Sequence, residues 1–255
     1  MSVRPKKELG QHFLVDENIL GVIGRLAELA PDDAVLEVGP GLGVLTRYLA
    51  RHVARVDAVE LDRSLEPHLR DLPANVDVHW GDALQLDLAS VAPRATKLVA
   101  NLPYNVATPL VVESLDGLPR VELWCVMVQR EVADRLFAEP RTKAYGAVSV
   151  LVQLAARRTG FHAVPRTVFR PPPNVHSALV AFRRIELPQD FARIKQVVGA
   201  AFAHRRKTIP NSLQLAGLCN RSEAETALER IGRDPSTRAE ALAPAEFVGL
   251  AEALP

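Results

Sequence analysis

The chain has 255 residues, of which 48% are hydrophobic and 24% charged, so it can bury a sizeable core and is not a disordered protein. The formal net charge is only +1, and the two cysteines, Cys125 and Cys219, lack the spacing of a disulfide framework or a zinc site. Uncharged stretches such as residues 144–156 are shorter than the roughly 20 apolar residues that cross a bilayer. We therefore expect a soluble cytoplasmic protein with no membrane segment and no metal.

The charges are unevenly distributed along the chain. Acidic residues dominate residues 31–100, whereas basic residues gather at Arg4, Lys6 and Lys7 and again within residues 183–207. Either basic group alone is equally compatible with an ordinary solvated face. Two such groups on both sides of an acidic region favour a polyanionic partner such as a nucleic acid.

The first part of the chain alternates between strand and helix patterns. Because strands that recur with helices between them form a parallel sheet covered on both faces, the carboxyl ends of the strands should share one edge. The pattern predicts strands at 34–38, 53–61, 76–80, 97–100 and 121–128, with helices at 44–52, 107–115 and 131–139.

The pattern changes after Tyr145. A helix over 146–156 and a strand near 158–164 precede Pro171–Pro173, which must be an extended surface segment because consecutive prolines fit neither a helix nor a central strand. We expect the following strand, residues 177–182, to close the sheet. Apolar residues then recur at helical spacing from Leu187 onward, with breaks near Pro210 and Asp234. The predicted domains are therefore residues 1–185 and a small helical domain of residues 186–255.

A glycine turn, Gly39-Pro40-Gly41-Leu42-Gly43, lies between the first predicted strand and its helix. Such a turn lets a ligand approach bare backbone, although an ordinary tight turn has the same composition. Pro40 lacks an amide hydrogen that a pyrophosphate would use, and the spacing differs from that of dinucleotide-binding turns. A nucleoside cofactor without a pyrophosphate is therefore favoured over NAD.

Acidic residues close the next two predicted strands. Glu60 follows the glycine turn by about 20 residues, the spacing at which a carboxylate accepts hydrogen bonds from ribose hydroxyls. Asp82, at the end of the third strand, is placed to accept a hydrogen bond from an adenine amino group. Either acid alone could equally be a helix cap or a solvated charge. Together with the glycine turn, they predict an adenosine pocket.

The fourth strand ends in Asn101-Leu102-Pro103-Tyr104, which matches the (N/D/S)-(I/L/P)-P-(Y/F) pattern of enzymes that methylate exocyclic amines of bases. The Asn101 side-chain oxygen and the Leu102 carbonyl can each accept one amine hydrogen, which would aim the nitrogen lone pair at a methyl donor. Pro103 stiffens the turn. Tyr104 offers an aromatic face to a base that has left its stack.

Five separated motifs resemble one family, the small-subunit ribosomal RNA adenine dimethyltransferases, which are relatives of the erythromycin-resistance methylases. The resemblance implies a Rossmann-like class I S-adenosylmethionine-dependent methyltransferase, an α/β fold with a mostly parallel seven-stranded sheet, plus a small helical C-terminal RNA-binding domain. It also implies dimethylation of N6 on two adjacent adenines in the 3′-terminal hairpin loop of 16S ribosomal RNA. The motifs are KKELGQHFL (6–14), EVGPGLGVLT (37–46), NLPY (101–104), VFRPPPNVHSALVAF (168–182) and HRRKTIPNSL (204–213).

The resemblance also assigns roles to residues. Phe169 would cover the second face of the base, although an ordinary core ring is the alternative for this residue. His12 stands where many members of the family have Asn, in contact with the cofactor carboxylate. Pro210 is a second departure, because members usually carry a basic residue there. The residues expected to bind S-adenosylmethionine are His12, Leu14, Gly39, Gly41, Glu60, Leu61, Asp82, Ala83 and Asn101; the expected catalytic residues are Asn101, Leu102, Pro103, Tyr104 and Phe169; the expected RNA contacts are Arg205, Arg206 and Lys207.

Two other functions remain open at this point. A large-subunit methylase of the macrolide-resistance type would use the same chemistry on a different RNA, although the segment Arg205-Arg206-Lys207-Thr208 speaks against it. A ribosome-assembly factor that binds RNA with little activity would keep the fold, but a decayed pocket would not bind the cofactor. We expect a monomer that acts on 16S ribosomal RNA in the small subunit or its precursor.

Overall fold

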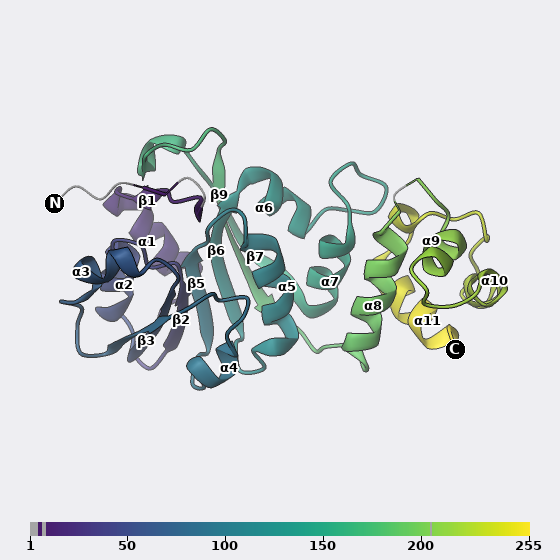
Figure 1. Ribbon diagram of the computed structural model, residues 1–255, viewed down its shortest axis with the longest axis horizontal. Coiled ribbons are helices and arrows are strands. Elements are labelled where there is room, and N and C mark those ends of the chain that lie inside the picture. Colours follow the sequence, from purple (N-terminus) through teal and green to yellow (C-terminus); the bar gives the residue numbers. More distant parts are fainter. Residues whose placement is uncertain (1–4, 7–8, 205) are drawn as a thin grey trace. The chain divides into compact units, whose positions relative to one another are not determined.

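The computed structural model describes residues 5–6, 9–204 and 206–255, and the chain divides into two compact units (Figure 1). Unit 1 comprises Met1–Ala133 and Arg158–Arg184, and unit 2 comprises Asp134–Arg157 and Ile185–Pro255. The second break between the units falls after Arg184. Residues 134–157, however, group with unit 2 and not with the N-terminal domain, because helix α7 (Ala147–Ala155) packs on α8 (Phe191–Phe202) and α11 (Pro244–Ala253).

Unit 1 is built on a mixed sheet whose strand order is β4-β3-β2-β5-β6-β9-β7, seven strands within the described residues. The five strands from β4 to β6 are parallel, and β9 runs antiparallel to β6. The predicted α/β class with a mostly parallel seven-stranded sheet is therefore confirmed. The strands are β2 (Ala34–Val38), β3 (Arg55–Glu60), β4 (Val76–Trp80), β5 (Lys97–Asn101), β6 (Leu123–Gln129), β7 (Ala156–Val164) and β9 (Ser177–Arg184).

The prediction that the strand starting at Ser177 closes the sheet is wrong. That strand, β9, lies between β6 and β7, and β7 forms the edge. The burial of the two strands explains the order: residues 177–182 are all buried, whereas most of β7, including Arg158 and His162, is exposed. A run of apolar residues is typical of a strand covered on both faces, and a polar strand belongs at an edge.

The pairing of β2 with its two neighbours, and of β3 with β4, brings the expected site residues to the carboxyl edge of the sheet. Strand β2 pairs with β3 and β5, with Val35 opposite Lys97 and Leu36 opposite Leu98, so the turn after β2 lies beside the end of β5. On the other side Glu60 of β3 pairs with Trp80 of β4. The helices of unit 1 are α1 (Glu17–Leu26), α2 (Val44–Ala50), α3 (Glu66–Leu69), α4 (Leu88–Val91), α5 (Ala107–Gly117) and α6 (Arg130–Leu136), the last of which continues into unit 2.

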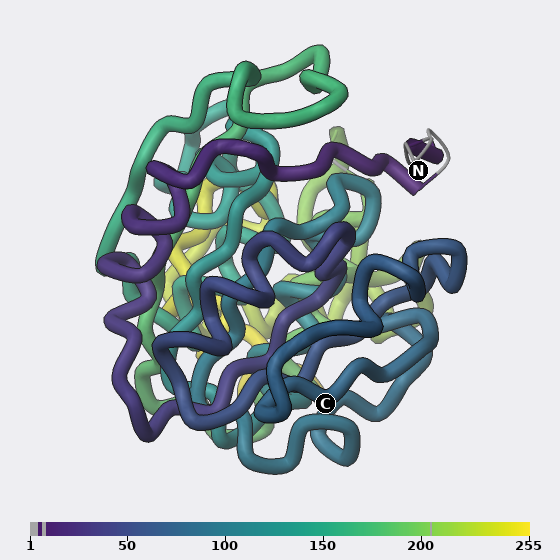
Figure 2. Tube along the Cα trace, turned by 90° about the vertical axis from the view of Figure 1, so that its left-hand side faces the viewer, coloured from purple at the N-terminus to yellow at the C-terminus, as the bar shows by residue number. Residues whose placement is uncertain are grey.

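A second, small sheet ties the N-terminal segment to the proline-rich segment. Strand β1 (Phe13–Leu14) pairs antiparallel with β8 (Phe169–Arg170), with Leu14 opposite Phe169. Figure 2 shows the purple N-terminal trace running beneath the green loop that contains β8. The sequence analysis predicted neither strand, because two residues are too short to show a period.

Unit 2 is helical as predicted. Its C-terminal part consists of α8, α9 (Ile209–Leu215), α10 (Arg221–Arg230) and α11. The break expected at Pro210 falls earlier, between Phe202 and Ile209, because Pro210 occupies the first turn of α9, where no amide hydrogen is needed. Within the described part of the chain, no helix combines the length and apolar character needed to cross a bilayer.

Candidate functional site

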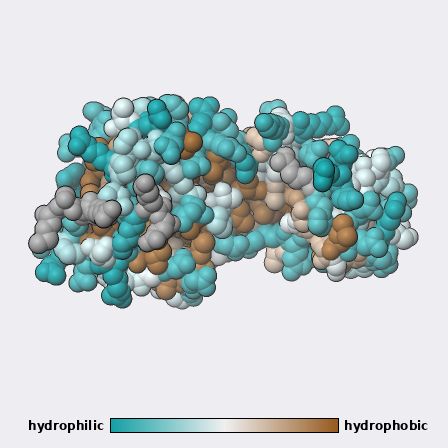
Figure 3. Space-filling model, turned by 45° about the horizontal axis from the view of Figure 1, so that its top comes forward, coloured by the Kyte–Doolittle hydropathy of each residue, from teal (hydrophilic) through white to brown (hydrophobic). Residues whose placement is uncertain are grey.

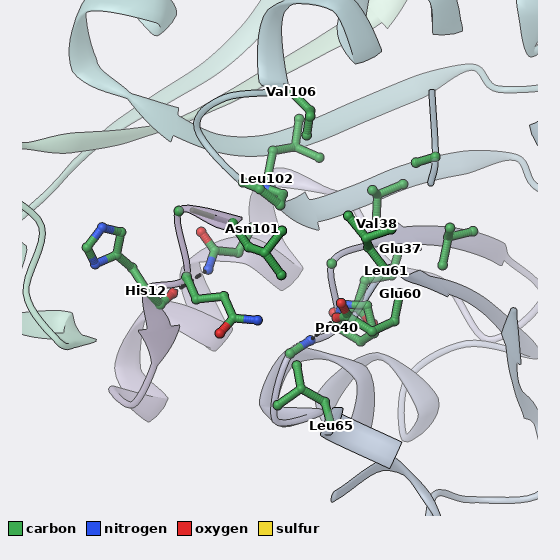
Figure 4. A pocket seen from close by; sticks show the side chains of 18 of the residues that line it. His12, Glu37, Val38, Pro40, Glu60, Leu61, Leu65, Asn101, Leu102 and Val106 are labelled. Carbon is green, nitrogen blue, oxygen red and sulfur yellow. Dashed lines mark hydrogen bonds between the residues drawn. The ribbon is translucent and has the colours of Figure 1, made fainter. Parts of the chain in front are cut away.

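A cavity opens at the carboxyl edge of the sheet in unit 1, over the ends of β2, β3, β4 and β5 (Figure 4). Its walls also include the N-terminal segment around β1. The cavity brings together almost every residue that the sequence assigned to the cofactor or to catalysis. These are His12, Leu14, Gly39, Gly41, Glu60, Leu61, Asp82, Ala83, Asn101, Leu102, Pro103 and Tyr104.

The glycine turn presents bare backbone to this cavity. Gly39 and Gly41 have φ of 75° and 59°, a region that other residues rarely adopt. A Cβ atom on Gly39 would lie 3.2 Å from Pro103 Cδ, and one on Gly41 would lie 3.1 Å from a ring carbon of Phe13. The turn therefore packs against the Asn101–Tyr104 segment on one side and against β1 on the other, with no room for side chains.

Glu60 organises the backbone around the same turn. Its Oε2 accepts a hydrogen bond from the Gly41 amide at 3.1 Å, and its Oε1 accepts one from the Asp62 amide at 2.8 Å. The residue is 6% exposed, and burial raises the pKa of its carboxyl group. Each oxygen has a further lone pair, so the carboxylate can still accept hydrogen bonds from two neighbouring hydroxyls of a ligand in the cavity.

Glu37 is a site residue that the sequence analysis missed. It lies inside the apolar strand β2, is 1% exposed, lines the cavity, and its Oε2 has no hydrogen-bond partner among the described residues. Burial raises the pKa of Glu37 to about 8. The available signal was an acid within the otherwise apolar run Ala34–Val38. A buried carboxyl oxygen without a partner is suited to a hydrogen-bond donor of a ligand.

The raised pKa of Glu37 predicts a specific dependence of stability on pH. The folded chain holds this proton up to a pH of about 8, whereas an unfolded chain releases it near 4.5. Between these values the folded state binds more protons, so the free energy of unfolding should fall as the pH rises. Chemical denaturation of the ligand-free protein across this range measures the slope.

The Glu37→Gln variant is the control for that slope. It should lose much of the pH dependence, and the remainder reflects Glu60, whose carboxyl pKa is raised in the same direction. Equal slopes in the variant and the unmodified protein would show that Glu37 is already ionised in the empty cavity.

Asn101 ends β5 with its side chain held in one orientation. Its Nδ2 donates a hydrogen bond to the His12 carbonyl oxygen at 3.2 Å, as the dashed line in Figure 4 shows. The side-chain oxygen is then the atom left to accept a hydrogen from a ligand amine. The Leu102 amide donates to the Met127 carbonyl at 3.1 Å, which fixes the next residue of the turn to β6.

Tyr104 stands next to this turn with a partly buried ring. Its hydroxyl makes a 2.6 Å hydrogen bond with the Ser177 hydroxyl at the start of β9. Burial raises the pKa of the Tyr104 phenol, so the group stays neutral. A neutral ring held at both ends is suited to stacking on a base, because it offers a flat face with little loss of freedom.

Phe169 is placed differently from expectation, and His12 makes a contact that the sequence did not indicate. Phe169 is 1% exposed, packs within the hydrophobic core and does not line the cavity, so it offers no face to a base in this structure. Successive residues of a strand point to opposite sides, and in β8 the phenylalanine points inward while Arg170 is exposed. His12 lines the cavity, but its Nδ1 donates to the Pro171 carbonyl oxygen at 2.8 Å and its ring lies 5.5 Å from the Tyr104 ring.

The N-terminal segment is fastened over the cavity by Asp62. One carboxylate oxygen accepts a hydrogen bond from Lys6 Nζ at 2.7 Å and the other from Gln11 Nε2 at 2.9 Å. Burial opposes ionisation of Asp62, but these donors and Ser64 outweigh it and lower the pKa of the carboxyl group. Because Gln11 also lines the cavity, the ionised Asp62 holds this wall in place.

The expected RNA contacts lie in unit 2, in the turn between α8 and α9. Arg206 and Lys207 are exposed there, while Arg205 lies outside the described residues.

In the part of the chain that the structure describes, no group of three histidine, cysteine or acidic residues could hold a metal ion.

Comparison with known proteins gives consistent matches over the whole chain. The family model described as ribosomal RNA adenine dimethylase matches residues 3–254. A ribosomal RNA small subunit methyltransferase A from Rubrobacter xylanophilus is 46% identical over 97% of this chain and 94% of its own length. The protein of the same name from Thermobifida fusca is 45% identical over 100% of this chain and 92% of its own length.

Solved structures show the same fold. A dimethyladenosine transferase from Plasmodium falciparum superposes with a TM-score of 0.78 at 24% identity, covering 94% of this chain and 96% of that one. The 23S rRNA methyltransferase ErmE gives a TM-score of 0.63 at 29% identity, covering 95% of this chain and 99% of its own.

Proposed function

The chain belongs to the ribosomal RNA adenine dimethylase family, and we propose that it transfers methyl groups from S-adenosylmethionine to N6 of two adjacent adenines. The proposed target is the 3′-terminal hairpin loop of 16S ribosomal RNA in the small subunit or its precursor. One observation carries the proposal: Glu60, Asp82 and the Asn101–Tyr104 segment line a single cavity. The proposed nucleoside site and the proposed amine site would therefore be contiguous.

The residues of the cavity fit S-adenosylmethionine. Glu60 would accept hydrogen bonds from the ribose hydroxyls, Asp82 would accept one from the adenine amino group, and the glycine turn would let the ligand lie on bare backbone. Glu37 Oε2, which has no hydrogen-bond partner among the described residues, would accept a hydrogen bond from the amino group of the ligand. When bound, the cofactor supplies a methyl group activated by a positively charged sulfur.

The chain's own contribution to the transfer is positioning. The N6 amine of adenine is a poor nucleophile because its lone pair is delocalised into the ring. The Asn101 side-chain oxygen and the Leu102 carbonyl would each accept one amine hydrogen, which favours the pyramidal amine and directs its lone pair. Correct placement of two reactants can lower a barrier by about 7–11 kcal/mol, so no strong base is needed.

Tyr104 would receive the base that has left its stack. Base-to-aromatic stacking contributes about 1–3 kcal/mol per base, which partly offsets the cost of unstacking. Arg206 and Lys207 in unit 2 would contact RNA phosphates, together with Arg205. We propose that the protein acts as a cytoplasmic monomer on the assembling small subunit.

Labelling of ribosomal subunits tests the proposal. Unmethylated small subunits are incubated with S-adenosylmethionine carrying a labelled methyl group, and the modified bases are mapped. We expect label on two adjacent adenines near the 3′ end of 16S ribosomal RNA, with two methyl groups on each. Label in large-subunit RNA would support the macrolide-resistance type of methylase. Absence of label together with no cofactor binding would support an assembly factor.

A further inference from the structure

One long part of the chain carries no acidic residue. Between Glu139 and Glu186 there is no aspartate or glutamate. The portion that belongs to unit 1 nevertheless contains five cationic side chains, so its charge is wholly positive. They are Arg158, Arg166, Arg170, Arg183 and Arg184.

Two of these arginines are used inside the fold. Arg184 donates to the carbonyl oxygens of Leu115, Val121 and Leu118 at 2.6 to 2.8 Å, and Arg183 forms an ion pair with Glu28. These two side chains therefore have partners within the protein.

Arg166 and Arg170 are exposed and lie on what we call the proline segment, residues 165–176. Arg166 is held by a 3.3 Å hydrogen bond from Nη1 to the Asn174 carbonyl oxygen. The proline segment is the green part at the top of Figure 1, directly above β1. Figure 3 brings that side forward and shows many hydrophilic residues there, interrupted by hydrophobic ones.

The proline segment contacts two residues that line the cavity. Arg170 pairs with Phe13 across the small sheet, and the Pro171 carbonyl accepts the hydrogen bond from His12. At its other end, the segment leads into Ser177, which holds the Tyr104 hydroxyl. A strand of RNA whose base lies against Tyr104 would therefore have this segment close by.

Arg130 and Phe161 continue the same surface. The Arg130 amide donates to the His176 carbonyl oxygen at 2.9 Å, and its guanidinium lies 4.8 Å from the centre of the Phe161 ring. Phe161 lies on the edge strand β7, and its side chain is 37% exposed although it is hydrophobic. A guanidinium stacked on an exposed ring gives a flat, cationic face of the kind that single-stranded nucleic acids contact.

We propose that this rim surface, formed by Arg130, Phe161, Arg166, Arg170 and His176, binds the single-stranded RNA that flanks the target adenine. Arg166 and Arg170 neutralise phosphates of that strand. The inference rests on the proposed function for the identity of the RNA. It assigns to unit 1 a contact separate from Arg205, Arg206 and Lys207, and it agrees with the absence of acidic residues from the segment.

The test measures how RNA affinity depends on salt. The Arg166→Ala/Arg170→Ala variant is titrated with a synthetic hairpin of the target loop between about 50 and 200 mM salt. Each lost phosphate contact on a single strand should reduce the slope of log affinity against log salt by about 0.7, so the double variant should lose roughly 1.4. Binding of S-adenosylhomocysteine, measured in parallel, should be unchanged and reports on the fold of the cavity.

Two further variants make the result specific. Arg94→Ala/Arg120→Ala removes the same charge from exposed positions before β5 and β6, at the opposite edge of the sheet, and should leave the slope unchanged. Arg166→Lys/Arg170→Lys keeps the charge and should retain most of the slope. An unchanged slope in the alanine variant, or an equal loss in the lysine variant, would overturn the proposal.

The test of the rim surface can fail independently of the test of the proposed methyl transfer. If the unmodified protein methylates the expected adenines but the alanine variant keeps its salt slope, only the rim surface is refuted. If the slope falls but no adenine is methylated, the surface stands as an RNA contact and the proposed activity fails.

Discussion

Replacing Asn101 with alanine should lower the rate of methyl transfer by about 10²–10³-fold, while the affinity for S-adenosylmethionine changes much less. A factor of this size is typical when one preorganised polar contact to the reacting group is removed. The variant loses the oxygen that accepts an amine hydrogen, but the turn remains fixed through the Leu102 amide and Met127. Single-turnover rates at saturating RNA and cofactor measure the transfer, and calorimetry measures cofactor binding.

Asn18→Ala is a matched control for this experiment. It makes the same chemical change at an exposed position of α1 and should leave both quantities unaffected. A near-normal transfer rate in the Asn101→Ala variant would remove the amide from the reaction. A large parallel loss of cofactor affinity would instead make it a cofactor ligand.

Replacing Glu60 with alanine should produce the opposite pattern, a large loss of cofactor affinity. The carboxylate fixes the Gly41 and Asp62 amides and is the proposed acceptor for the ribose hydroxyls. Hydrogen bonds to charged groups contribute about 1.5–3 kcal/mol each, so the dissociation constant should rise on the order of 100-fold. Calorimetric titration with S-adenosylhomocysteine measures it.

Transfer at saturating cofactor should fall much less in the Glu60→Ala variant, because the amine-binding turn is separate. Glu66→Ala, at an exposed position of α3, provides the control for loss of a nearby carboxylate. If the affinity of the Glu60→Ala variant equals that of the control, the nucleoside does not lie where the account places it.

The cofactor side of the cavity could be predicted from the sequence because it depends on strand order. Residues 34–38 and 76–80 form strands at the predicted bounds, since a glycine follows directly after each of them. Parallel strands place their carboxyl ends at one edge, so Glu60, Asp82 and Asn101 had to lie near one another. Their presence around one cavity therefore followed from the pattern.

The other features depend on side-chain direction and packing, which the pattern does not contain. Nothing in the sequence shows that Phe169 points into the core or that His12 donates to the Pro171 carbonyl. Burial of the Glu37 carboxyl depends on both faces of β2 being covered. The grouping of residues 134–157 with unit 2 likewise depends on which helices pack together.

A crystal structure of the protein with S-adenosylhomocysteine tests the central claim most directly. The account predicts the ribose against Glu60, the adenine beside Asp82 and the sulfur facing the turn of Asn101 and Tyr104. A nucleoside bound elsewhere, or a sulfur facing away from that turn, would contradict the claim that one cavity joins the methyl donor to the acceptor amine.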